Sequence, residues 1–259
     1  MKNANDTSNN IHPTAIVEGN VNLGSGNTIG AYSILRGNIT LGINNYIGEH
    51  CLFTRNIEIG NNNRFEAFVA IGALGEMGAK GDVFIEDGKI IIGDGNTFRE
   101  YVNVHSPVRR KTTQIGNKCY IMNKVYIAHD CQIGDGVMMS ALTKFGGGVT
   151  AGDNANFGMG AAVHQWTDVA ENVMVGMNAA VNKHIPPFVI VAGSPCRILR
   201  MNKVGLTRRG FTEHDVDLLN ERYSSLLAGD TKAHTELEEK VVAFISTHEK
   251  HLNKFRDQE

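Results

Sequence analysis

The chain of 259 residues lacks several features that would assign it at once to a class of protein. No apolar run approaches the roughly 18 residues that a membrane-spanning helix needs, so we expect no membrane span. Residues 1–10 are polar and lack the apolar segment of an export signal, so we expect a cytoplasmic protein. The formal net charge is only −2, which gives no electrostatic case for a nucleic-acid partner.

Cysteine is also scarce. The four cysteines, Cys51, Cys119, Cys131 and Cys196, lie far apart and show no CxxC spacing. This pattern predicts reduced, partly buried thiols and neither a disulfide framework nor a zinc centre, so we expect no metal site.

Aromatic residues make up only 7% of the chain, with one tryptophan, whereas there are 29 glycines and 26 asparagines. An α/β enzyme with an aromatic-rich core is therefore disfavoured. Glycine and asparagine tolerate positive φ angles, so the composition indicates many tight turns around small aliphatic side chains.

Every sixth residue is apolar in three long blocks: eleven positions from Ile11 to Ile71, three from Ile92 to Val104, and twelve from Ile115 to Val181. A helix would repeat every 3.6 residues and an ordinary strand every two. A period of six instead predicts short parallel strands joined by tight turns, three to a triangular coil of eighteen residues. The blocks together predict a solenoid of about nine coils.

The interruptions of the period predict the domain organisation. We expect a polar extension at 1–10, a parallel β-helix at 11–205 with loop excursions at 73–89 and 106–113, and a helical domain at 206–259. The helical pattern begins with Thr212 as an N-cap candidate, and a helical cover on the open end of a solenoid is expected.

One histidine stands apart from the others. His129 follows the inward Ile127 by two places, so its imidazole should point away from the core, and Asp130 follows it directly. An imidazole can accept a proton from a hydroxyl nucleophile, and a carboxylate can orient it. Eighteen residues further on is Gly147, and eighteen beyond that is Gln165, preceded by His164. This column resembles an active-site strip in which the glycine N–H stabilises an oxyanion.

Four segments carry a more specific resemblance: 127–131 (IAHDC), 162–165 (AVHQ), 185–188 (IPPF) and 204–211 (VGLTRRGF). They resemble the UDP-N-acetylglucosamine O-acyltransferases that begin lipid A synthesis. The resemblance implies a left-handed parallel β-helix with a C-terminal helical domain, assembled as a homotrimer. It also implies transfer of a 3-hydroxyacyl chain from acyl carrier protein to the sugar 3-hydroxyl, with the carrier thioester as donor and no separate cofactor.

The same resemblance assigns roles to individual residues. His129 would be the general base, Asp130 its orienting partner and Gly147 the oxyanion donor. Contacts with the sugar, the acyl chain and the nucleotide would come from Lys80, His164, Gln165, Asn202, Arg208 and Arg209. Met177 would end the acyl groove, which predicts a donor of medium length because a methionine fills space that a glycine leaves open.

Some positions depart from the family pattern and leave the acceptor open. Tyr126 and Gly148 stand where histidines are common, and the usual Asp-Leu-Lys of the sugar loop appears as Glu76-Met77-Gly78. The alternative is a related hexapeptide-repeat acyl- or acetyltransferase acting on the hydroxyl or amine of another nucleotide amino sugar.

Two other classes of solenoid fit less well. A zinc hydratase resembling the γ-class carbonic anhydrases needs histidines spaced five apart, and the chain has no such pair. A binding solenoid such as an ice-binding protein needs a flat, regular threonine face, whereas the outward positions here are irregular.

Overall fold

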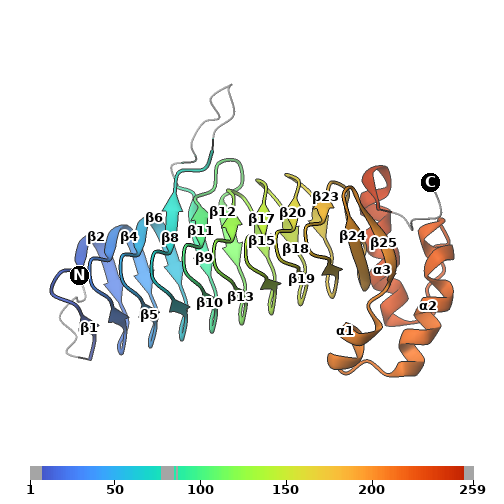
Figure 1. The fold of residues 1–259 in the computed structure, drawn as a ribbon, viewed down its shortest axis with the longest axis horizontal. Helices are drawn as coiled ribbons and strands as arrows, with labels where there is room; N and C mark the ends of the chain where they lie inside the picture. Colours follow the sequence, from blue (N-terminus) through green and yellow to red (C-terminus); the bar gives the residue numbers. More distant parts are fainter. Residues whose placement is uncertain (1–7, 77–84, 86, 254–259) are drawn as a thin grey trace.

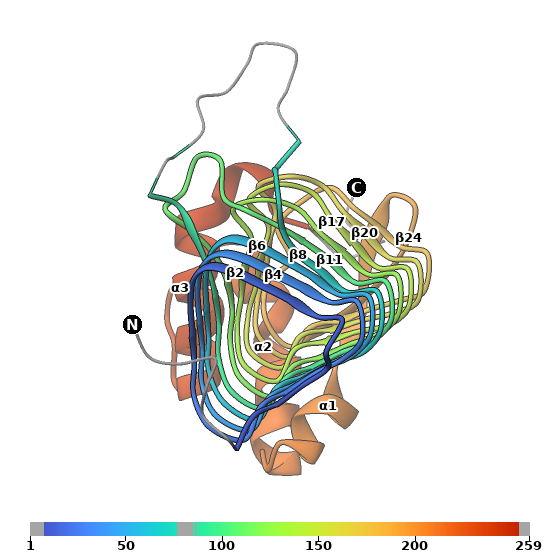
Figure 2. The same cartoon turned by 90° about the vertical axis from the view of Figure 1, so that its left-hand side faces the viewer.

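The computed structural model describes residues 8–76, 85 and 87–253. These residues form a long parallel β-helix with a group of helices at its C-terminal end (Figure 1). Seen along the axis, successive coils superimpose as a rounded triangle (Figure 2). The predicted fold class, an all-β solenoid with a C-terminal helical domain, is therefore confirmed.

The first face of the triangle is an eleven-stranded sheet. Its strands are β1 (Asn10–Ile11), β3 (Thr28–Ile29), β5 (Tyr46–Ile47), β7 (Arg64–Phe65), β10 (Thr97–Phe98), β13 (Tyr120–Ile121), β16 (Met138–Met139), β19 (Asn156–Phe157), β22 (Met174–Val175), β24 (Val189–Gly193) and β25 (Cys196–Met201). All pairs are parallel except β24 with β25, which turns back and ends the stack.

The other two faces belong to one fourteen-stranded sheet. In the N-terminal coils three long strands bend across the corner between these faces: β2 (Ile16–Leu23), β4 (Ile34–Leu41) and β6 (Leu52–Ile59). Beyond β6 the faces separate. One contains β8 (Ala70–Ala73), β11 (Asn103–His105), β14 (Tyr126–Ile127), β17 (Lys144–Phe145), β20 (Ala162–Val163) and β23 (Ala180–Val181). The other contains β9 (Lys89–Ile92), β12 (Thr112–Ile115), β15 (Gln132–Ile133), β18 (Thr150–Ala151) and β21 (Asp168–Val169).

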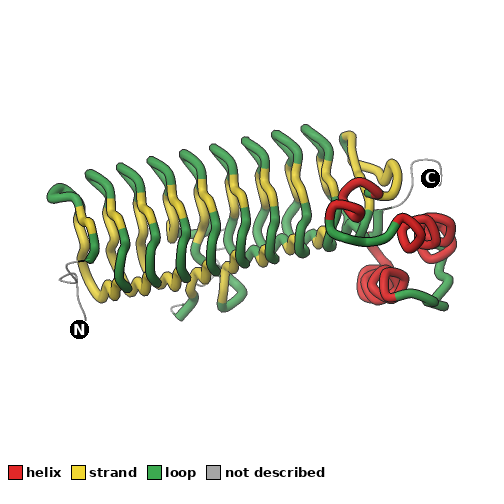
Figure 3. The backbone as a smooth tube through the Cα atoms, turned by 90° about the horizontal axis from the view of Figure 1, so that it is seen from below, coloured by secondary structure: helices red, strands yellow, loops and turns green. Residues whose placement is uncertain are grey.

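The register between coils is eighteen residues wherever the repeat is uninterrupted, as in the pairing of Thr28 with Tyr46. The two excursions increase the spacing between paired residues but keep the strands in line, since Arg64 pairs with Thr97 across the first excursion and Thr97 with Tyr120 across the second. The parallel rows of strands that result are visible in Figure 3. After nine rungs from β1 to β22, β24 adds a tenth, one more than the hexapeptide count predicts.

A ladder of buried asparagines explains part of the unusual composition. Asn27, Asn45, Asn63 and Asn96 are at most 1% exposed and occupy the same corner of successive coils. The amide of Asn63 donates to Gly93 O at 2.9 Å, and its Oδ1 accepts the backbone N–H of Asn96 at 2.9 Å. Each side chain thus satisfies backbone groups inside the coil, where an unpaired polar group would be costly.

Helices close the C-terminal end of the solenoid. They are α1 (Lys203–Arg208), α2 (Glu213–Leu227), α3 (Glu236–His248) and the 3₁₀ turn η1 (Glu249–His251). Thr212 caps α2 by accepting the N–H of Asp215, as its sequence position predicts. Tyr223 of α2 is buried, and its hydroxyl donates to Pro187 O at 2.6 Å. Among the described residues, none of the helices combines the length and apolarity that crossing a bilayer requires.

Candidate active site

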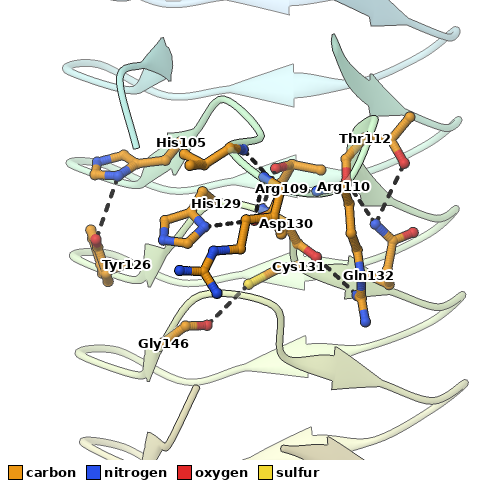
Figure 4. Close-up of polar contacts among 12 residues, drawn as sticks. His105, Arg109, Arg110, Thr112, Tyr126, His129, Asp130, Cys131, Gln132 and Gly146 are labelled. Carbon is orange, nitrogen blue, oxygen red and sulfur yellow. Dashed lines mark hydrogen bonds and ion pairs between the residues drawn. The ribbon is translucent and has the colours of Figure 1, made fainter. Parts of the chain in front are cut away.

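His129 and Asp130 lie in the turn after β14, at one corner of the β-helix. Asp130 has a φ of +66°, a left-handed conformation that turns its carboxylate back toward the preceding side chain. His129 Nδ1 lies 2.8 Å from Asp130 Oδ2 (Figure 4). Because a carboxylate only accepts hydrogen bonds, this contact places the imidazole proton on Nδ1 and leaves Nε2 able to accept one.

The carboxylate of Asp130 is fully buried and is held by backbone amides. Oδ1 accepts the N–H of Val108 at 2.9 Å, of Arg109 at 3.1 Å and of Arg110 at 2.9 Å, while Arg109 N also lies 3.0 Å from Oδ2. These three consecutive N–H groups, in the excursion before β12, form a cradle for an anion. The cradle fixes the carboxylate so that Oδ2 faces the imidazole.

A cleft of about 500 Å³ opens beside this pair. It spans three coils, because its lining includes His129, then Gly146 and Gly147, then His164 and Gln165. The structure therefore brings together the column that the eighteen-residue spacing predicts. The roles of its members remain predictions.

Gly147 packs directly against the imidazole. A Cβ built on it would lie 2.7 Å from His129 Nε2, so no larger residue fits without moving the ring. Its carbonyl accepts the N–H of Trp166 at 2.9 Å. Its own N–H makes no hydrogen bond within the described part of the chain, and so it is available to an oxyanion.

Tyr126 and Glu76 also line the cleft, two residues that the sequence marks only as departures from the family pattern. The Tyr126 hydroxyl lies 3.5 Å from His105 Nδ1. Burial, assisted by the charge of Glu76, raises the pKa of Tyr126 to about 12. Burial also lowers the pKa of His105. At neutral pH both groups are therefore uncharged, and the phenol is a hydrogen-bond donor at the edge of the cleft.

The predicted nucleotide-binding residues lie elsewhere in the chain. Asn202 caps α1 by accepting the N–H of Gly205 at 3.1 Å, and its amide donates to Asn172 O at 2.9 Å. Arg208 is exposed at the end of α1, and Arg209 lines a separate hollow of about 600 Å³ with residues such as Asp94 and Asn154. Within one chain the structure does not bring these residues to the His129 cleft.

Two further predicted residues do not line the cleft either. Lys80 lies outside the described residues. Met177 follows β22 and is 72% exposed, so the predicted end of the acyl groove is an open surface in a single chain.

A second cluster of ionisable groups was not anticipated from the sequence. Asp168, His184 and His248 place ligand-type atoms within 4.8 Å of one another, between the last coils and α3. His248 Nε2 contacts Asp168 Oδ2 at 2.7 Å, and His184 Nδ1 accepts the N–H of Asp168 at 3.0 Å. These hydrogen bonds fasten α3, which carries His248, to the last coils of the β-helix.

Coils of hexapeptides with a His–Asp pair beside a three-coil cleft define a hexapeptide-repeat transferase. Residues 112–147 match the model described as bacterial transferase hexapeptide (six repeats). Residues 185–258 match the second domain of UDP-N-acetylglucosamine O-acyltransferase.

Relatives extend the match over most of the chain. An acyl-[acyl-carrier-protein]–UDP-N-acetylglucosamine O-acyltransferase of Syntrophobacter fumaroxidans is 37% identical over 219 residues, which are 83% of this chain and 84% of the relative. The chain therefore belongs to the UDP-N-acetylglucosamine O-acyltransferase family. A Burkholderia mallei enzyme of the same name is 36% identical over 143 residues, 54% of this chain, and the match spans only about half (55%) of that relative.

A solved structure agrees with this assignment. The UDP-N-acetylglucosamine acyltransferase of Francisella novicida superimposes with a TM-score of 0.87 at 25% identity, covering 95% of each chain. The solenoid is thus the left-handed parallel β-helix that the sequence resemblance implies.

Proposed function

We propose that this chain transfers a 3-hydroxyacyl group of medium length from acyl carrier protein to the 3-hydroxyl of UDP-N-acetylglucosamine, the first step of lipid A synthesis. The names of the relatives support the reaction. The observation in this chain that carries it is the contact between His129 Nδ1 and Asp130 Oδ2 at 2.8 Å, which leaves Nε2 as a base beside the cleft.

In this mechanism His129 Nε2 takes the proton of the sugar 3-hydroxyl as the oxygen attacks the thioester carbonyl carbon. The Gly147 N–H stabilises the oxyanion of the tetrahedral intermediate. The intermediate collapses with cleavage of the carbon–sulfur bond, and the imidazolium returns its proton to the departing thiolate. The products are the sugar ester and the free thiol of the carrier protein, so atoms and charge balance without a separate cofactor or a metal.

The direct test is to incubate the protein with 3-hydroxyacyl carrier protein and UDP-N-acetylglucosamine and to follow the O-acyl product by mass spectrometry. The expected result is product formation that His129→Ala abolishes. Undiminished turnover after dialysis against a chelator is expected if no metal takes part. No O-acyl product with the wild-type protein would overturn the proposal.

Tyr126 and Glu76 in the cleft favour one alternative acceptor chemistry, a different nucleotide amino sugar acylated on oxygen or nitrogen. A neutral phenol donates one hydrogen bond, whereas the histidine common in the family can also carry charge. Offering a UDP-sugar with a 3-amino group beside UDP-N-acetylglucosamine distinguishes the two. A higher kcat/KM for the amine would favour the alternative.

We further propose that the enzyme works as a homotrimer in the cytoplasm, with each site completed by a second copy. Arg209 and the His129 cleft lie in separate hollows of one chain, so a site that uses both needs two copies. A row of exposed rings, Tyr32, His50, Phe68 and Tyr101, stacks at centroid distances of 5.0–5.1 Å on one corner and offers an apolar surface for association. Sedimentation should give three times 28.2 kDa; a monomer would exclude this arrangement.

A further inference from the structure

Residues 108–113, which run from the loop after β11 into β12, bind Asp130 at both its backbone groups as well as at its carboxylate. Asp130 N donates to Thr113 Oγ1 at 2.8 Å, and Asp130 O accepts from Arg110 Nη1 at 3.0 Å. With the amide cradle at 108–110, every polar group of Asp130 is engaged by residues 108–113 or by His129. Figure 4 shows Asp130 between His129, Arg109 and Arg110.

The Thr113 hydroxyl accepts the hydrogen bond that a backbone carbonyl accepts at the same corner in the next two coils. At the equivalent corner, Gly148 N donates to His129 O at 2.8 Å and Trp166 N donates to Gly147 O at 2.9 Å. For Asp130 the preceding coil is opened by the excursion, and its N–H finds the fully buried Thr113 hydroxyl instead. The hydroxyl therefore stabilises the left-handed conformation of Asp130 on which its contact with His129 depends.

Arg110 connects the same corner to the next coils. Its guanidinium carbon lies 5.1 Å above the Trp166 ring while Nη1 binds the Asp130 carbonyl. Trp166 in turn holds the carbonyl of Gly147 through its N–H. Arg110 thus connects the coil of His129 with the coil of Trp166, which follows that of Gly147. Its cation–π contact with Trp166 reinforces its hydrogen bond to Asp130.

We propose that Thr113 and Arg110 are positioning residues for catalysis: they act through Asp130, holding the carboxylate that orients His129. The kinetic part of this inference rests on the proposed function, whereas the structural part does not. Neither residue is among those that line the cleft of a single chain, so their role is argued through Asp130.

The charged and titratable groups facing the pair come from several elements. Arg109 and Arg110 belong to the loop, His105 to β11, and Cys131 follows Asp130 in the chain; Glu76 is one of the residues that line the cleft. Burial raises the pKa of Cys131 to about 12, so its thiol stays neutral. The carboxylate of Asp130 is consequently the acidic group in contact with His129, and its displacement would break the contact that orients the ring.

The experiment compares Thr113→Val, which keeps the shape but removes the acceptor, with Thr113→Ser, which retains it. In Thr113→Val we expect kcat to fall by about 100-fold, as for a small misplacement of a catalytic group. The KM for UDP-N-acetylglucosamine should stay within about twofold, because binding contacts are unchanged. Thr113→Ser should restore most of the rate.

A second readout needs no activity. In ¹⁵N-histidine spectra the His129 Nδ1–H proton, bonded to a buried carboxylate, should be protected from exchange in the wild type and in Thr113→Ser. It should be lost in Thr113→Val. If the wild type transfers no acyl group to UDP-N-acetylglucosamine, the proposed function fails while this comparison still decides the positioning role.

Arg110→Met provides an independent variant if Thr113→Val does not fold, since methionine keeps an apolar stem on Trp166 and removes the donor. We expect a lower kcat with the same loss of the protected proton, and partial recovery in Arg110→Lys. A wild-type kcat and an intact Nδ1–H signal in folded Thr113→Val or Arg110→Met would overturn the inference.

Discussion

His129 and Asp130 are adjacent in the chain, yet their side chains meet, with Nδ1 2.8 Å from Oδ2. Adjacent residues in an extended segment point to opposite sides, so this contact requires a sharp local turn. The turn is supplied by the φ of +66° at Asp130, which the hydroxyl of Thr113 in β12 stabilises. His129 and Asp130 are thus a two-residue unit whose geometry is imposed from another coil.

Replacing Asp130 by asparagine should lower kcat by about 100-fold or more, because an amide no longer fixes the imidazole tautomer. The asparagine NH₂ group, itself a donor, would also face the backbone N–H donors of the cradle at 108–110, which bind an acceptor. The measurement is kcat with acyl carrier protein donor. Asp153→Asn is the matched control, since its Oδ1 accepts the Asp135 N–H on another corner, and it should keep the wild-type rate. Equal rates for both variants would contradict the role of Asp130.

Gly147→Ala should be folded but nearly inactive. Its methyl group would lie 2.7 Å from His129 Nε2 and displace the ring, since real Cβ contacts are longer than 3.0 Å. The control is Gly229→Ala after α2, where no atom lies within 4 Å of the new Cβ but φ is +105°. That change should cost about 1 kcal/mol of unfolding free energy through backbone strain and leave kcat unaltered.

Met177→Gly should shift donor preference toward longer 3-hydroxyacyl chains. The side chain is 72% exposed, so its removal frees space on the surface without opening the core. The ratio of kcat/KM for a longer and a shorter acyl carrier protein should rise several-fold. Leu199→Ala, which also removes an exposed apolar side chain, should leave the ratio constant. An unchanged preference in Met177→Gly would show that this residue does not limit chain length.

The protein should lose stability as the pH falls below about 6.5, the ordinary pKa of histidine. Burial, together with the charge of His248, lowers the pKa of His184, and burial lowers that of His105. The unfolded state therefore takes up protons first on acidification, and the free energy of unfolding decreases through this window.

The contribution of His184 can be isolated with His184→Asn, which retains an acceptor for the Asp168 N–H and removes the titrating ring. Urea unfolding at pH 7.5 and pH 5.5 should show a smaller difference in this variant than in the wild type. The difference in unfolding free energy that remains in this variant includes the contribution of His105. An unchanged difference would contradict the assignment to His184.

Asn63→Ala should destabilise the fold by about 2–4 kcal/mol, because it leaves Gly93 O and Asn96 N without partners inside the coil. Asn61→Ala is the surface counterpart; its Oδ1 accepts the N–H of Ile43 at an exposed corner, and the cost should stay below about 1 kcal/mol. Denaturant titrations of both variants provide the comparison.

Sequence periodicity predicted the solenoid because inward positions recur locally. Leu35, Leu41 and Ile47, at six-residue intervals, are all buried, at most 1% exposed. Ile11 and Val17 belong to the same series but are only partly buried, since they lie in the first turn of the stack. The six-residue pattern predicts which side chains point inward, and the presence of a neighbouring coil on each side decides how completely they are buried.

The site was predictable only where it follows the coil period. His129, Gly147 and Gln165 are spaced by eighteen residues and meet in one cleft. Asp130 is held by residues 108–113, about twenty positions away across an irregular loop, and no periodicity encodes that contact. Arg209 likewise depends on how the helices fold against the last coils, which is set by tertiary packing alone.

The eighteen-residue register has a consequence for molecular length. Residue pairs from Ile16 with Ile34 to Leu23 with Leu41 repeat without a shift, so excising residues 24–41 would join Leu23 to Gly42 in phase. Each such removal shortens the β-helix by one rung of about 4.8 Å. In-phase deletions or insertions of whole coils would therefore change the distance between the N-terminal end and the His129 cleft in multiples of one rung.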